Sequence, residues 1–236
     1  IVFLANFIVI QQRKLTRNQD PLIDISLFKL KGFKIGLYAV LFHFMLHTAY
    51  LLIVAVYLQS GLGISALACG MYFIPHAILF MISSVFAGKL LPRYGKRVLQ
   101  LGLSIILVSF VLQMIFFSQR DHPFMSMLLI GMYGLGNGLV LPFLLNVVLD
   151  NIEEKDAGVA SGIFSTFQQT ASALGISIIG GIFYSILEHE YFKNNYLFAL
   201  QVGLLVGIFF LIIVWCMLSK LPRYYKSEKA ALHKLE

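Results

Sequence analysis

Six long apolar stretches dominate the sequence and limit what it can fold into. None of their interiors contains Asp, Glu, Lys or Arg, and they cover roughly residues 35–59, 64–87, 98–118, 124–149, 158–187 and 196–219. About 20 apolar residues suffice for an α-helix to cross a bilayer, and a helix satisfies its own backbone hydrogen bonds there. The sequence therefore predicts an all-α membrane protein with six transmembrane helices and the lipid bilayer as its surroundings.

Composition supports this class and argues against others. Hydrophobic residues make up 59% of the 236 residues and charged residues 12%, about half the charged share of a soluble domain. The net charge of +7 comes from cations in connecting segments and the tail, so no nucleic-acid interface is indicated. Cys69 and Cys216 both fall in apolar stretches, which favours neither a disulfide framework nor a zinc site.

The segments around the six spans suggest a larger protein. Residues 1–10 are apolar but too short to cross a membrane, and we interpret them as the end of a truncated span in a fragment of a longer polypeptide. Residues 11–34 form a polar connector, 35–219 the six-span domain and 220–236 a polar tail.

The distribution of Lys and Arg predicts an orientation. The connector, the turn at 88–97, the turn at 150–157 and the tail together carry sixteen of these residues, whereas the alternate loops carry only Arg120 and Lys193. Basic loops remain on the cytoplasmic side. We therefore expect a multi-pass protein of the cell membrane whose connector, basic turn and C-terminus are cytoplasmic.

The basic turn, Gly-Lys-Leu-Leu-Pro-Arg-Tyr-Gly-Lys-Arg, joins the second and third spans. Pro92 is expected to stop the preceding helix, and Gly88 and Gly95 suit a backbone that packs closely against helix ends. The turn resembles the signature loop of the major facilitator superfamily, Gly-x-Leu-x-Asp-Arg-x-Gly-Arg-Lys. The matching residues are Gly88, Leu90, Arg93, Gly95, Lys96 and Arg97, while Pro92 replaces the acid.

This resemblance implies a fold and a role for the turn. In that family the loop lies between the second and third spans of each six-span half, and the second copy is usually the degenerate one. The chain is thus expected to be a C-terminal half, built from two inverted three-helix repeats, whose N-terminal half is missing. The turn is expected to gate the cytoplasmic side through Gly88, Arg93, Gly95, Lys96 and Arg97.

A second stretch of the sequence indicates which branch of this superfamily the chain resembles. Residues 158–175 (GVASGIFSTFQQTASALG) are similar to the penultimate span of the 14-span drug:proton antiporters, with Gln168 and Gln169 where that family often has Arg-Gln. The resemblance implies proton-coupled efflux of drugs or other amphipathic small molecules by alternating access.

Histidines are the candidate proton carriers, because the spans hold no charged side chain. His43 and His47 lie four residues apart near the middle of the first span, hence on one helix face, and Tyr50 continues that face. Histidine has an unperturbed pKa of about 6.5, so it can bind or pass a proton near neutral pH. The alternative is a pair of neutral histidines hydrogen-bonded between helices. His76, beside Pro75, is expected to be structural.

Polar residues of two later spans complete the predicted substrate or proton pathway. Ser165 and Gln168 lie on one stripe, and Tyr133 and Asn137 lie four apart in a glycine-rich span. Hydrogen bonding between helices is the alternative role. Gly134 and Gly138 form a Gly-x-x-x-Gly motif, which favours close helix packing.

Other functions remain as alternatives or are disfavoured. A transporter of a defined solute such as a siderophore or sugar is one alternative, and a truncated, non-transporting membrane scaffold is another. The spans hold no cation, which favours neutral or cationic cargo over anions. We expect no enzyme, no cofactor and no metal site, because the sequence offers no nucleophile–base pair, phosphate-binding loop or telling ligand spacing.

Overall fold

The computed structural model describes residues 28, 31–118, 122–149, 152 and 156–219, and this part of the chain is helical, without strands. The elements are α2 (Lys31–Val56), α3 (Ala66–Tyr72), α4 (Ile74–Tyr94), α5 (Lys96–Phe116), α6 (Pro123–Leu149), α7 (Ala157–Gly175), α8 (Gly181–Glu188) and α9 (Tyr196–Ser219). The predicted truncated span at 1–10, most of the connector and the tail at 220–236 lie outside the described residues.

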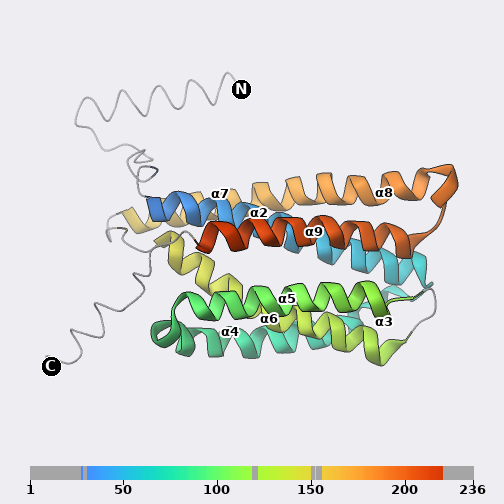
Figure 1. The fold of residues 1–236 in the computed structure, drawn as a ribbon, viewed down its shortest axis with the longest axis horizontal. Coiled ribbons are helices and arrows are strands. Elements are labelled where there is room, and N and C mark those ends of the chain that lie inside the picture. The colour runs from blue at the N-terminus through green and yellow to red at the C-terminus, as the bar shows by residue number, and fades with distance from the viewer. Residues whose placement is uncertain (1–27, 29–30, 119–121, 150–151, 153–155, 220–236) are drawn as a thin grey trace, which may run out of the picture.

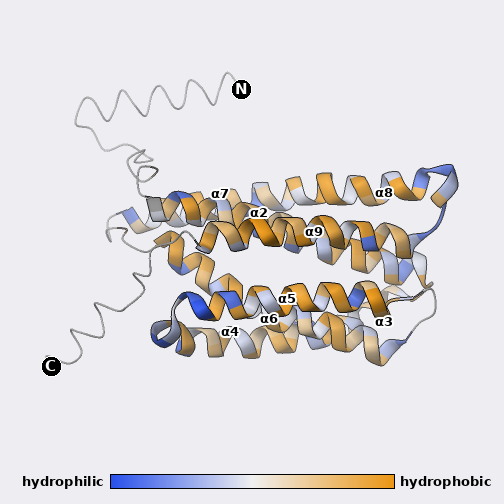
Figure 2. Cartoon of the chain, viewed as in Figure 1, coloured by the Kyte–Doolittle hydropathy of each residue, from blue (hydrophilic) through white to orange (hydrophobic). Residues whose placement is uncertain are grey.

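These helices form six spans, as predicted. Short π-helical segments at Tyr57–Gly61 and Ile176–Gly180 extend α2 and join α7 to α8, and α3 continues into α4. The apolar spans are Gly32–Gly61, Ala66–Tyr94, Lys96–Phe116, Pro123–Leu149, Ala157–Glu188 and Tyr196–Ser219. Apolar residues cover the lengths of the helices, while hydrophilic ones gather mainly near their ends (Figure 2).

The contacts between the spans follow the same pattern in both halves of the domain, as expected for two three-helix repeats that exchange their first helices. The first span, α2, packs mainly against α7 and α9, the last two spans. The fourth span, α6, packs mainly against α4 and α5, the second and third spans. In Figure 1 α2 runs from left to right and α6 from right to left, so the two repeats are inverted.

The predicted ten-residue turn is much tighter than expected. Helix α4 continues through Pro92 to Tyr94, so the predicted stop at Pro92 is wrong. Pro92 lacks one backbone N–H donor, but the helix continues for two residues beyond it. Gly95 ends the helix instead, with φ of 54° and ψ of −131°, a conformation that glycine tolerates far better than other residues. The predicted close packing of Gly88 is also wrong, since a Cβ there would meet nothing within 4 Å.

Glycines bring α6 into close contact with its neighbours. Gly134 and Gly138 lie against the backbone of α4, and Gly136 lies against Gly102 of α5. The predicted role of the Gly-x-x-x-Gly motif in helix packing is therefore confirmed. Gly158 and Gly162 of α7 have open space around them instead.

Candidate functional site

A chain of buried polar groups joins α2 to α6 near the middle of both helices. Nε2 of His43 lies 2.8 Å from Oδ1 of Asn137, and Nδ2 of Asn137 lies 2.9 Å from Nδ1 of His47. The hydroxyl of Tyr133 lies 2.8 Å from the same Nδ1. His43, Asn137 and Tyr133 are fully buried. We call His43, His47, Tyr133 and Asn137 the histidine–amide cluster.

The amide of Asn137 fixes where the hydrogens of this cluster lie. An amide oxygen only accepts and an amide NH₂ only donates, so His43 donates from Nε2 and His47 accepts at Nδ1. Because that nitrogen then carries no hydrogen, the hydroxyl of Tyr133 beside it can only act as a donor, and the two donors share its single lone pair. The remaining nitrogen of His43, Nδ1, is buried and has no hydrogen-bond partner. The cluster therefore contains one buried, free acceptor.

A third histidine, His76 of α4, lies beside the cluster although it was expected to be structural. Its ring centroid is 6.4 Å from that of His47 and 5.6 Å from that of Tyr133. Its Nε2 is also buried without a hydrogen-bond partner. His76 follows Pro75 at the start of α4, and no local sequence spacing connects it with residues of α2 or α6.

Tyr50 links the cluster to a second buried network. Its ring centroid lies 3.8 Å from that of Tyr133, and its hydroxyl donates to Oε1 of Gln113 on α5 at 3.2 Å. The Nε2 of Gln113 donates to Ser109 at 2.9 Å, and Ser109 donates to the carbonyl oxygen of Leu129 at 2.9 Å. Sequence analysis missed Gln113 and Ser109, because single polar residues in an apolar run give no local signal of what they contact.

The structure does not bring Ser165 and Gln168 into the cluster. Ser165 is exposed and donates to the carbonyl oxygen of Ser161, one turn earlier, and Gln168 is half-buried. Neither side chain hydrogen-bonds to the histidines. Helices α2 and α7 are joined instead by Thr48, whose hydroxyl donates to that of Ser172 at 2.9 Å.

The residues of the predicted gating turn lie at one end of the bundle. Gly88 is exposed on α4, and the guanidinium carbon of Arg93 lies 5.4 Å from the ring centroid of Tyr94. Lys96 and Arg97 occupy the first turn of α5, where the helix dipole disfavours cations. Their positive charge therefore does not stabilise that helix.

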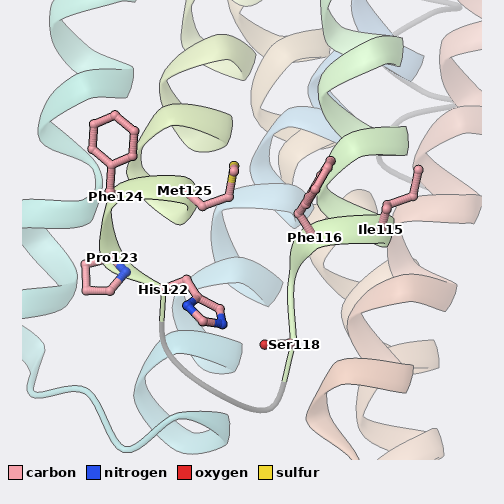
Figure 3. A pocket seen from close by; sticks show the side chains of 7 residues that line it. All are labelled: Ile115, Phe116, Ser118, His122, Pro123, Phe124 and Met125. Atoms are coloured by element: carbon pink, nitrogen blue, oxygen red, sulfur yellow. The ribbon is translucent and has the colours of Figure 1, made fainter.

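An open hollow lies between the end of α5 and the start of α6. It has a volume of about 510 Å³, is mostly apolar and is lined by Ile115, Phe116, Ser118, His122, Pro123, Phe124 and Met125 (Figure 3). None of the predicted pathway residues lines it. Within the described part of the chain, no three His, Cys, Asp or Glu side chains are grouped to hold a metal ion.

Comparison with known proteins places the chain among transporters. Residues 7–176 match the model of the Major Facilitator Superfamily. The Probable actinorhodin transporter of Streptomyces coelicolor is 25% identical over 79% of this chain and 33% of its own length. Quinolone resistance protein NorB of Staphylococcus aureus (strain MRSA252) is 27% identical over 93% of this chain and 47% of its own length. Lincomycin resistance protein LmrB of Listeria monocytogenes is 28% identical over 70% of this chain and 35% of its own length.

The chain thus spans between about a third and a half of the length of these relatives. The family match covers most of the sequence, and the six apolar helices in two inverted triplets agree with it. One of these relatives is a transporter by name and two are resistance proteins by name. Together with the family match, these names agree with the expectation that the chain is not an enzyme. The chain is a multi-pass membrane protein that belongs to the Major Facilitator Superfamily.

Proposed function

We propose that this chain is the C-terminal six-helix half of a proton-coupled exporter of drugs or other amphipathic compounds, of the 14-span type, in the cell membrane. Two of the relatives above are named for resistance to quinolones and to lincomycin, and such names fit export of small amphipathic molecules. The share of each relative that the chain covers is compatible with one half of a transporter.

The histidine–amide cluster is the observation that carries the proposal. Ionisable side chains within transmembrane segments are costly and usually functional. In the described spans, apart from their ends, histidines are the side chains that can change charge near neutral pH. They lie where the first helices of the two inverted repeats meet, and transporters of this type bind their ions near the midplane, between repeats.

The uncovered helices indicate where the rest of the transporter would pack. The α4 span and the α7–α8 span are the least buried of the six, and α4 exposes large apolar side chains at Ile78, Met81 and Val85. We propose that the missing N-terminal half faces these two spans across the translocation cavity. Ser165 and Gln168 of α7 would then line the cavity.

The basic turn and the tail would lie in the cytoplasm. Arg93, Gly95, Lys96 and Arg97 would close the cavity there during alternating access, with Gly88 exposed beside them on α4. The support for this orientation is the excess of Lys and Arg on that side of the sequence.

Transport of one defined solute is the second candidate. It is favoured by the relative from Streptomyces coelicolor, which is named for a single compound, actinorhodin. The two candidates differ in how many dissimilar compounds the protein exports.

Efflux of a fluorescent cationic dye tests the first proposal. Cells that express the whole protein with both His43→Ala and His47→Ala should lose proton-driven efflux while the protein level in the membrane stays normal. His122 is exposed on a loop, so His122→Ala serves as the matched control and should transport normally. Unchanged efflux in the double variant would rule out coupling through these histidines.

A further inference from the structure

The amide of Asn137 makes the two histidines of the cluster inequivalent. His43 presents an N–H to the amide, whereas His47 presents a bare nitrogen that already accepts from Asn137 and Tyr133. A proton can therefore bind Nδ1 of His47 only if both donors turn away. Nδ1 of His43 is free and needs no such rearrangement.

We propose that His43 is the site of proton binding, that the proton binds its Nδ1, and that His47 is a neutral positioning residue. This inference rests on the proposed proton coupling and names the atom that binds the proton. Binding forms one N–H bond from the free lone pair, with a proton supplied by the aqueous side. Nε2 keeps its hydrogen, and its bond to Oδ1 of Asn137 becomes charge-assisted and hence stronger.

The same geometry limits the cluster to one proton. With His43 charged, Oδ1 of Asn137 remains turned toward His43, so Nδ2 must continue to donate to His47. The ring centroids of His43 and His47 lie 6.4 Å apart, and a second positive charge at that distance in a weakly screened interior is unfavourable. Two imidazolium rings would also place donors on both sides of an amide that can accept on only one.

The surroundings of His43 make proton binding depend on conformation. The other titratable groups in or beside the cluster are His76 from α4, Tyr133 from α6 and Tyr50 from α2. In the described spans a carboxylate occurs only at one end, at Glu188. A buried imidazolium without a counter-charge is costly. Protonation therefore favours a state in which water reaches His43, and a ligand that prefers one state shifts the equilibrium toward it.

Nitrogen NMR of the protein in lipid nanodiscs, labelled with ¹⁵N-histidine, tests the assignment directly. The sequence has six histidines, and single histidine replacements assign their signals. At high pH both His43 and His47 should carry hydrogen on Nε2 alone. On acidification His43 should become imidazolium while His47 stays neutral. An imidazolium at His47, at both positions or at neither would overturn the proposal.

Replacement of Asn137 provides the second measurement. In Asn137→Asp a carboxylate can accept from both rings, so both histidines should become imidazolium as the pH falls. If His47 remained neutral in this variant, Asn137 would not be the residue that limits the cluster to one proton. The NMR spectra of the labelled wild-type protein test the proposal even if the Asn137→Asp variant does not fold.

Dye efflux separates failure of this inference from failure of the proposed function. His43→Gln should abolish the dependence of efflux on the proton gradient. His47→Gln, which keeps an amide that can donate and accept, should lower efflux by less and leave it dependent on the gradient. Equal loss in both would contradict the division of roles between the two histidines. If efflux by the wild-type protein continued after the proton gradient was collapsed, proton coupling itself would be refuted, whatever the NMR spectra show.

Discussion

Gly134 of α6 lies so close to the backbone of His76 of α4 that a side chain on residue 134 would overlap it. An ideal Cβ would fall 2.7 Å from the Cα of His76. This approach sets the distance between the two helices and brings the ring of His76 beside Tyr133. The glycine packing and the histidine–amide cluster are therefore parts of one arrangement.

Gly134→Ala should destabilise the protein, because α4 and α6 would have to separate. Overpacking of this kind typically costs about 1–3 kcal/mol, and we expect a lower midpoint of thermal unfolding in detergent. Gly162→Ala on α7 is the matched control, since a Cβ there meets nothing within 4 Å. Equal unfolding midpoints for Gly134→Ala and wild type would show that the two helices can separate at little cost.

Gly95→Ala should also destabilise the protein, for a different reason. Its φ of 54° and ψ of −131° are unfavourable for a residue with a Cβ, and such strain costs about 1–3 kcal/mol. Gly88→Ala, in the same turn region but exposed and helical, should leave the unfolding midpoint unchanged or slightly raised. If Gly88→Ala were the more damaging of the two, the roles assigned to these glycines would have to be exchanged.

The number and positions of the spans could be predicted because the bilayer requires long apolar stretches. Each predicted stretch overlaps its observed span to within a few residues at most ends. The turn between α4 and α5 was predicted less well, because Pro92 alone does not show where a helix ends. Gly95 supplies the backbone conformation that ends it.

The site could be predicted only in part. Spacing places His43 and His47 on one face of α2, and Tyr133 and Asn137 on one face of α6, but it does not say that these faces meet. His43 and Asn137 are 94 residues apart, and their contact depends on how the two repeats pack. His76 and Gln113 were missed as site neighbours for the same reason.

Gln113→Leu should cost stability, because it leaves buried polar partners unsatisfied. Tyr50 and Ser109 would both lose a hydrogen bond with the Gln113 amide. Interhelical hydrogen bonds in membrane proteins contribute about 0.6–2 kcal/mol, so the loss should be of that order, measured by unfolding in detergent. Gln100→Leu, at a half-exposed position of the same helix, is the matched control. A stable Gln113→Leu protein would show that the hydroxyl of Tyr50 finds another partner.

Cysteine labelling along α7 tests whether this helix lines the cavity. After replacement of Cys69 and Cys216, cysteine at position 165 or 168 should react with a water-soluble maleimide in the whole protein, because these positions are exposed and half-buried. Cysteine at 160 or 163, which are buried on the same helix, should not react.

A transported dye should slow labelling at 165 and 168 if the two residues lie beside its path. Labelling at 165 and 168 that the dye leaves unchanged would remove both residues from the proposed pathway, and an absence of labelling there would show that lipid or another part of the protein covers this face.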